Sequence, residues 1–518
     1  MQLANNNKKK SSKRKGTNSS NSSNTKIRSS LTNKNSNGNS NNGNSNTSKT
    51  DLKFEDGGFP DIIVEDEVVN NDNEFAMPQK MPSANNNNKS DNNNNNNNND
   101  NNNTTRVYRP GKDTMGEDEK LDFDPTAYKL YHSMTASWPC LTFDIVRDRL
   151  GVGRKRFPVT MYMAAGTQAD KPENNEIILM KLSDLHKVQR EYDEEDEEDE
   201  DDADDLDEDP ILISKSIKHI GGVNRLRSMP QSPNIISTWS DTGAVHIYDA
   251  EVQLKSLDGP ALPGSKQASE MPIYTFSGHG QEGYAMDWSK AHPGRLITGD
   301  CNRNIHLFEP VGNANAPSWS INSSTPFSGH TASVEDLQWS PTEKTVFASC
   351  SMDRSIRIWD TRQHDKSQLV VQEAHDQDVN VLSWNSLVGF LLASGGDDGA
   401  FKVWDLRNFK ADTPVAHFKY HLAPITSVEW SPTEDSVVAV SGADDQVSIW
   451  DMSLEEDREE QGMIQSGQIE GIDDLPPQLL FVHQGQRDIK EIHFHPQVPG
   501  VIVSTAGDGF NVFRSCNM

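Results

Sequence analysis

The feature that most constrains this chain is a segment that recurs between Gly329 and Asp451. A His residue and a later Trp-Asp pair keep the same separation in three copies: His330 with Trp359-Asp360, His375 with Trp404-Asp405, and His421 with Trp450-Asp451. A repeat of ~40 to 45 residues cannot bury its hydrophobic face alone, so its copies must stack. Each copy ends in a run that alternates polar and apolar residues, which predicts a strand with one buried face.

Other polar positions also recur in each copy. The full sets are His330, Ser349, Asp353 and Trp359; His375, Ser394, Asp398 and Trp404; and His421, Val440, Asp444 and Trp450. A Ser-His-Asp nucleophile site would occur once, beside an activating base. Recurrence in every copy instead predicts a buried hydrogen-bond network that braces the repeat. Val440 cannot hydrogen-bond through its side chain, so the third network is expected to be incomplete.

A repeat with a Gly-His opening and a Trp-Asp ending resembles the WD40 family of β-propellers, in which each copy is one four-stranded blade. The resemblance implies an all-β, seven-bladed propeller over residues 143–518. The other expected blades contain residues 159–185, 235–249, 279–309 and 483–514, with Thr238 and Thr298 at the hydroxyl position. The last strands are expected to pair with the N-terminal segment, because ring closure removes exposed sheet edges.

Residues 1–104 are rich in Asn, Ser and Lys and cannot bury enough apolar surface to offset chain entropy, so they are predicted to be disordered. A basic cluster within them predicts a nuclear localisation signal, although a solvated tail is the alternative: Lys8, Lys9, Lys10, Lys13, Arg14 and Lys15. No apolar run reaches the ~18 residues of a membrane span, and the four cysteines have no metal-ligand spacing. A soluble intracellular protein without a metal is therefore expected.

Residues 105–142 are predicted to form an N-terminal helix and an entry segment. Asp124 can cap a helix, and Ala127, Leu130, Tyr131 and Met134 follow at helical spacing. The helix is expected to end near Ser137 and to lie on the side of the propeller. The sequences at 128–130 and 138–143 resemble the entry segment of the histone-binding retinoblastoma-associated WD40 proteins. Those at 107–111 and 143–148 are closer to the glutamate-rich WD-repeat group, which acts in ribosome biogenesis.

Acidic residues dominate an insertion at 191–209, which is predicted to be disordered. The formal charge is -29, although residues 1–50 carry ten Lys and Arg and no acid. A strongly acidic body favours basic protein partners over direct nucleic-acid binding. Relatives in the resembled group carry an acidic run at the same place, so a polyanionic clamp is predicted, with a solubilising loop as the alternative. The clamp residues are Asp193, Glu194, Glu195, Asp196, Glu197, Glu198, Asp199, Glu200, Asp201 and Asp202.

A second acidic loop, 452–478, ends in paired prolines. The resemblance implies that this loop and the N-terminal helix grip a basic amphipathic helix of a partner. The candidate groove residues are Leu130, Tyr131, Met134, Asp473, Asp474, Leu475, Pro476 and Pro477. The alternative is that the helix only covers a blade and that the loop is solvated.

Three functions remain open, and none is enzymatic or uses a cofactor. The first is a nuclear, largely nucleolar chaperone of a basic client, which the resemblance implies is a large-subunit ribosomal protein. The second is a histone-binding subunit of a chromatin complex. The third is a substrate receptor of a cullin-type ubiquitin ligase, suggested by Arg362 and Arg407, each of which follows a Trp-Asp pair by two positions. A monomer is expected.

Overall fold

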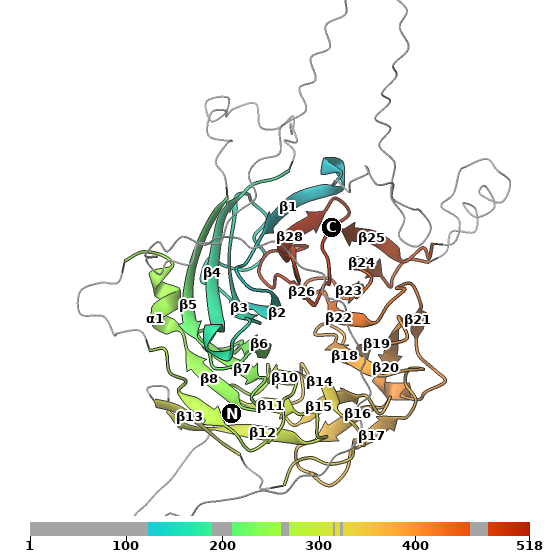
Figure 1. The fold of residues 1–518 in the computed structure, drawn as a ribbon. Coiled ribbons are helices and arrows are strands. Elements are labelled where there is room, and N and C mark those ends of the chain that lie inside the picture. Colours follow the sequence, from blue (N-terminus) through green and yellow to red (C-terminus); the bar gives the residue numbers. More distant parts are fainter. Residues whose placement is uncertain (1–122, 189–209, 261–268, 314–315, 322–324, 456–474) are drawn as a thin grey trace, which may run out of the picture. The chain divides into compact units, whose positions relative to one another are not determined.

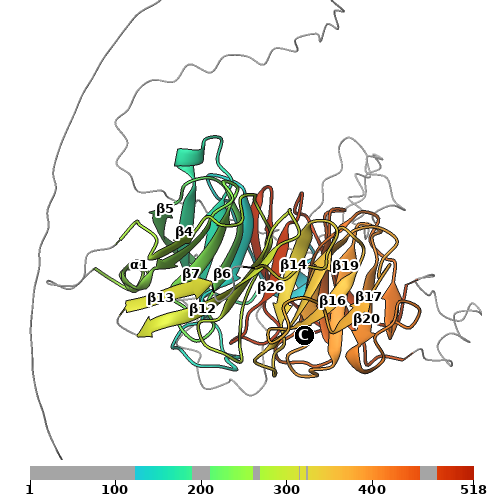
Figure 2. The same cartoon turned by 90° about the horizontal axis from the view of Figure 1, so that it is seen from below.

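The computed structural model describes residues 123–188, 210–260, 269–313, 316–321, 325–455 and 475–518 (Figure 1). The predicted disordered tail, the localisation signal and the acidic clamp lie outside these residues. The described chain forms seven four-stranded antiparallel sheets arranged as blades around a central axis (Figures 1 and 2). The prediction of an all-β, seven-bladed propeller is therefore confirmed.

Blades 1 to 3 contain the less regular repeats. Blade 1 comprises β2 (Cys140–Ile145), β3 (Val159–Thr167), β4 (Glu176–Leu185) and β5 (Ile211–Lys218). Blade 2 comprises β6 (Val223–Ser228), β7 (Ile235–Ser240), β8 (Val245–Asp249) and β9 (Tyr274–Phe276). Blade 3 comprises β10 (Ala285–Trp288), β11 (Leu296–Gly299), β12 (Ile305–Asn313) and β13 (Ala316–Ile321).

Blades 4 to 6 are the three clear repeats. Blade 4 comprises β14 (Val334–Trp339), β15 (Val346–Ser351), β16 (Ile356–Asp360) and β17 (Leu369–Val371). Blade 5 comprises β18 (Val379–Trp384), β19 (Leu391–Gly396), β20 (Phe401–Asp405) and β21 (Ala416–Phe418). Blade 6 comprises β22 (Ile425–Trp430), β23 (Val437–Gly442), β24 (Gln446–Asp451) and β25 (Leu479–Gln484).

Blade 7 joins the two ends of the described chain. Its strands are β26 (Glu491–Phe494), β27 (Ile502–Ala506), β28 (Gly509–Ser515) and β1 (Tyr128–Met134). β1 pairs antiparallel with β28, for example Tyr131 with Phe513 and Met134 with Phe510. The expected closure of the ring by the N-terminal segment is therefore confirmed.

The predicted N-terminal helix is wrong over most of its length. Asp124 does cap a turn, since its side chain accepts a 2.9 Å hydrogen bond from the Thr126 amide, but the helical turn η1 spans only Pro125–Ala127. The chain then continues as β1. A spacing of four residues, as between Leu130 and Met134, fits both one helical stripe and one face of a strand. Pairing with the open edge of β28 decides in favour of the strand.

Helical structure is sparse in the described part of the chain. It consists of η1, η2 (Pro172–Asn174), α1 (Glu251–Ser256) and η4 (Leu406–Asn408). Of these helices, none is long and apolar enough to cross a membrane. The core lies between neighbouring sheets, where large side chains such as Trp239, Trp359 and Phe401 are fully buried.

Candidate partner-binding surfaces

The repeated polar sets form the predicted bracing networks in blades 4 and 5. In blade 4, His330 Nε2 lies 2.6 Å from Ser349 Oγ and its Nδ1 lies 3.0 Å from Asp353, while the Trp359 indole donates to Ser349 at 2.8 Å. In blade 5, His375, Ser394, Asp398 and Trp404 repeat this geometry. The histidines are buried, so these residues stabilise the blades and offer no accessible nucleophile.

The expectation that the blade 6 network is incomplete is wrong. His421 Nε2 lies 2.8 Å from the hydroxyl of Ser448, and the Trp450 indole donates to the same hydroxyl at 2.8 Å. Ser448 on β24 lies directly opposite Val440 on β23. The hydroxyl has therefore moved across the strand pair, and Asp444 completes the set at 2.9 Å from His421 Nδ1.

The less regular blades keep parts of the same network. Thr238 and Thr298 contact His219 and His279 at 3.0 and 2.7 Å, as predicted for the hydroxyl position. In blade 7, sequence reasoning missed the partner of His483. Its two ring nitrogens lie 2.8 Å from the Tyr128 hydroxyl and 3.1 Å from Asn511 Nδ2, so the N-terminal strand takes part in the network.

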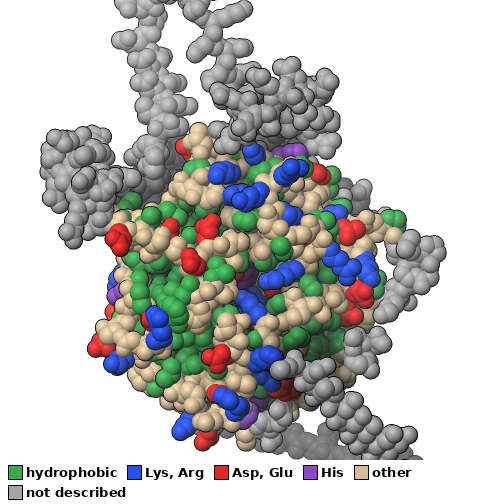
Figure 3. Space-filling view, turned by 180° about the vertical axis from the view of Figure 1, so that it is seen from behind, with side chains coloured by type: hydrophobic (Ala, Val, Ile, Leu, Met, Phe, Trp, Pro, Cys, Tyr) green, Lys and Arg blue, Asp and Glu red, His purple; other side chains and the backbone are tan. Residues whose placement is uncertain are grey.

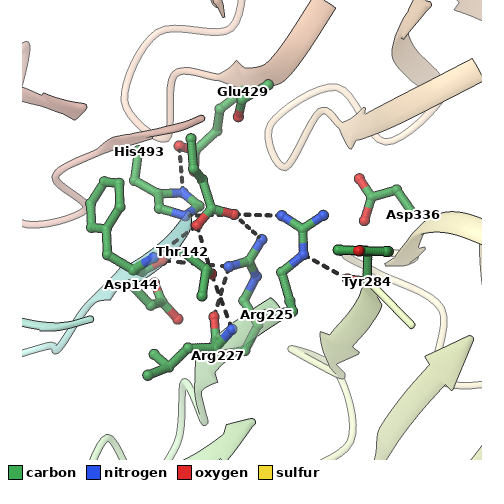
Figure 4. A network of polar contacts seen from close by, with 12 residues as sticks. Thr142, Asp144, Arg225, Arg227, Tyr284, Asp336, Glu429 and His493 are labelled. Atoms are coloured by element: carbon green, nitrogen blue, oxygen red, sulfur yellow. Dashed lines mark hydrogen bonds and ion pairs between the residues drawn. The ribbon is translucent and has the colours of Figure 1, made fainter. Parts of the chain in front are cut away.

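The central channel contains a charged network that the sequence did not reveal (Figure 4). The Glu491 carboxylate is buried and forms ion pairs of 2.7 Å with both Arg225 and Arg227. It also accepts hydrogen bonds from the Thr142 hydroxyl and the Phe143 amide, at 2.8 and 2.9 Å. The network thus joins blades 1, 2 and 7, which are distant in sequence.

His493 extends this network to blade 6. Its Nδ1 lies 3.1 Å from Glu429, and its Nε2 lies 3.7 Å from Glu491. Burial lowers the pKa of His493, but the two carboxylates outweigh burial and raise it to about 10. The imidazole is therefore a cation at neutral pH.

Asp287 shows the opposite balance. Its buried carboxylate accepts a 2.6 Å hydrogen bond from the Trp339 amide, and burial raises its pKa to about 7. A cavity of about 160 Å³ opens beside these groups and is lined by residues of the innermost strands. Among the described residues, no group of His, Cys, Asp or Glu could hold a metal ion.

The predicted groove does not form as expected. Leu130 and Met134 are buried in the core, 0% and 2% exposed, because they lie on the inner face of β1, and Tyr131 is half-buried. They cannot receive the apolar stripe of a partner. Leu475 is 42% exposed, Pro476 half-buried and Pro477 exposed, whereas Asp473 and Asp474 lie outside the described residues.

Carboxylates instead surround one mouth of the channel, where the innermost strands begin. We call this set the acidic rim; it comprises Glu282, Glu335, Asp378, Asp397, Asp445 and Asp508. Burial raises the pKa values of Glu335, Asp378 and Asp508, and neighbouring carboxylates add to each rise. Ring closure brings these residues together from five blades, so only the loop positions next to each innermost strand could have pointed to them.

Cations on the same face partly balance the acidic rim. Lys490 pairs with Asp488 at 2.6 Å, and Arg354 pairs with Glu373 at 3.6 Å. These cations are thus paired with other acids, and the rim carboxylates keep much of their negative potential.

Arg362 and Arg407 are exposed at the ends of blades 4 and 5. Each forms an ion pair with the Asp of its own Trp-Asp pair, Asp360 and Asp405 respectively. The Arg407 guanidinium also lies 3.6 Å from the centre of the Phe390 ring. Their predicted role as ligase-adaptor contacts stays a prediction.

Comparison with known proteins agrees with this architecture. A family model described as "WD domain, G-beta repeat" matches residues 321–360, 366–405 and 412–451. A second model, which describes the histone-binding protein RBBP4 and a component of the CAF1 complex, matches residues 118–186. The second match covers β1 and most of blade 1.

Three relatives cover most of the chain. Protein HEAT STRESS TOLERANT DWD 1 of Arabidopsis thaliana is 48% identical over 80% of this chain and 92% of its own length. Ribosome assembly protein rrb1 of Schizosaccharomyces pombe is 47% identical over 77% and 82%. Glutamate-rich WD repeat-containing protein 1 of Dictyostelium discoideum is 46% identical over 80% and 85%. This chain belongs to the glutamate-rich WD repeat protein family.

The family has a more distant histone-related branch. Histone acetyltransferase type B subunit 2 of Candida glabrata is 26% identical over 76% of this chain and 86% of its own length. The chain is therefore a WD40 protein homologous to a ribosome assembly protein and distantly related to histone-binding proteins. Its scaffold and its relatives indicate a protein-binding role in the nucleus and no enzymatic one.

Proposed function

We propose that this protein is a nuclear, largely nucleolar chaperone that binds a newly made basic protein of the large ribosomal subunit. The observation that carries the proposal is the acidic rim, where burial and mutual repulsion raise the pKa values of Glu335, Asp378 and Asp508. A basic segment would relieve this repulsion when it binds. The name of the rrb1 relative supports a place in ribosome assembly.

The acidic residues 193–202 would assist as a clamp for the same client. A run of like charges attracts a basic protein from a distance, although at physiological salt the Debye length is only ~8 Å. We assign long-range attraction to the clamp and docking to the acidic rim. Denser nucleic-acid charge could later displace both from the client.

Substitution of the acidic rim tests the proposal. The variant Glu335→Gln/Asp378→Asn/Asp508→Asn should weaken binding of the basic client, because it removes three negative charges at the docking surface. The matched control Glu173→Gln/Asp365→Asn/Asp412→Asn changes the same charge at exposed positions elsewhere. Isothermal titration with purified client should show at least ~10-fold weaker binding for the rim variant. Equal losses in both variants would contradict a specific rim.

Cellular depletion identifies the client class. Loss of free large subunits in sedimentation profiles, with aggregation of one basic ribosomal protein, is the expected result. Histone binding is the second candidate, favoured by the family match over residues 118–186. Unchanged subunit ratios together with defective nucleosome assembly would favour that function.

A further inference from the structure

One loop reverses the charge of this acidic protein. Residues 147–156 connect β2 to β3 and contain five cations and one acid, Asp148. The loop lies where β2 ends, on the face opposite the acidic rim. Figure 3 shows that Lys and Arg side chains gather around the centre of this face.

The loop has a fixed conformation. The Gln497 side chain is buried and accepts a 2.9 Å hydrogen bond from the Asp148 amide, while its own amide donates to the carbonyls of Asp148 and Gly151, each at 3.1 Å. Arg154 pairs with Asp148 at 2.7 Å and its backbone amide donates to the Gln497 carbonyl at 3.0 Å. Binding at this loop would therefore cost little conformational entropy.

The remaining four cations have no acidic partner within the described chain. Arg147, Arg149, Lys155 and Arg156 are all exposed, and the only acid of the loop is occupied by Arg154. Arg147 also lines the channel cavity together with Lys290. Burial lowers the pKa of His495 behind the loop to about 3, and the charges of Arg154 and Arg147 contribute to this decrease. The cations thus form a continuous positive surface from the loop to the channel mouth.

We propose that the loop 147–156 binds the phosphate backbone of RNA. Arginine matches phosphate geometry through two parallel hydrogen bonds, and three of the four exposed cations are arginines. A protein partner would gain most of its affinity from apolar anchors in pockets. The loop instead projects two exposed apolar residues, Leu150 and Val152, and offers no pocket for a partner's anchor. Phosphate binding needs only positioned cations and gains from counterion release.

This inference differs from what the average charge predicts. A net charge of -29 disfavours nucleic acid over the whole surface. The loop is a local exception, on the opposite face from the acidic rim. RNA and a basic client could therefore occupy the protein together, which suits transfer of a ribosomal protein to its RNA.

The test measures binding of a short, fluorescently labelled single-stranded RNA to the full-length protein by anisotropy. The variant Arg149→Ser/Lys155→Ser/Arg156→Ser removes three exposed cations that make no described contact. The control Lys215→Ser/Lys218→Ser/Lys410→Ser removes the same charge from exposed positions on blades 1 and 5. Both variants keep the basic N-terminal residues, so any contribution of that segment cancels.

The loop variant should bind RNA roughly 10- to 100-fold more weakly at 0.1 M salt, and the slope of log affinity against log salt should fall by ~2, since each phosphate contact on a single strand contributes ~0.7. The control should change little. Equal behaviour of the two variants, or no RNA binding by the unmodified protein, would overturn the proposal. A polyglutamate peptide is the second probe: loss of its binding in the loop variant, with RNA binding retained, would assign the loop to an acidic protein instead.

The outcome is independent of the chaperone proposal. The loop variant should bind the basic client normally, and the acidic-rim variant should keep its RNA binding. Failure of one therefore leaves the other standing.

Discussion

At the scale of single residues, sequence spacing predicted which side chains brace the blades but not every route by which they do so. The His, Asp and Trp positions held in all three clear repeats, because the backbone geometry of the blade fixes them. The hydroxyl position did not, since Val440 and Ser448 face each other on paired strands and either can reach His421. Such an exchange is invisible to an argument that follows one strand at a time.

The Ser448 hydroxyl should be essential to blade 6. Ser448→Ala would leave both the His421 ring and the Trp450 indole without their buried partner, at a cost of about 1 to 3 kcal/mol in unfolding free energy. Chemical denaturation measures this directly. The double variant Ser448→Ala/Val440→Ser should recover part of the loss, because it restores a hydroxyl at the position used in blades 4 and 5. No recovery would mean that the two positions are not interchangeable.

At the scale of elements, the sequence predicted the strands of the blades well and the N-terminal element badly. Alternation marks strands such as β16 and β20 clearly, and their Trp-Asp ends fix their register. Leu130 and Met134 carry no such mark, since their spacing suits a helix and a strand alike. Their structure depends on pairing with β28 at the other end of the chain, which no local pattern reports. The same limit hides the channel network, whose members come from blades 1, 2, 6 and 7.

The channel network should make stability depend on pH on the alkaline side. The folded-state pKa of His493, about 10, lies above its ordinary value of 6.5. Its stabilisation is therefore fully present below pH 6.5 and is lost as the pH rises through 10. The midpoint of urea denaturation should fall over this range.

Two variants identify the group responsible for this pH dependence. His493→Gln should flatten the alkaline decline. Asp287→Asn should keep it, because the pKa of Asp287 is raised from 3.8 to about 7 and its effect is confined to pH values between these two. An identical decline in wild type and His493→Gln would show that another group titrates.

At the scale of the whole molecule, closure of the ring depends on one short strand. β1 supplies the outer strand of blade 7, buries Tyr128, Leu130 and Met134, and places the Tyr128 hydroxyl against His483. The strands of all seven blades lie between residues 128 and 515, so each blade is complete within the described part of the chain. The family match that begins at residue 118 includes this closing strand.

Two truncations should therefore differ sharply. Removal of residues 1–122 should leave the thermal midpoint nearly unchanged, because every blade stays complete. Removal of residues 1–136 should cost on the order of 5 kcal/mol or more, since three large side chains lose their burial. It also exposes the edge of β28, which promotes association between chains. Calorimetry and size-exclusion chromatography of the two truncated proteins measure both effects; equal midpoints and equal elution would show that the ring closes without β1.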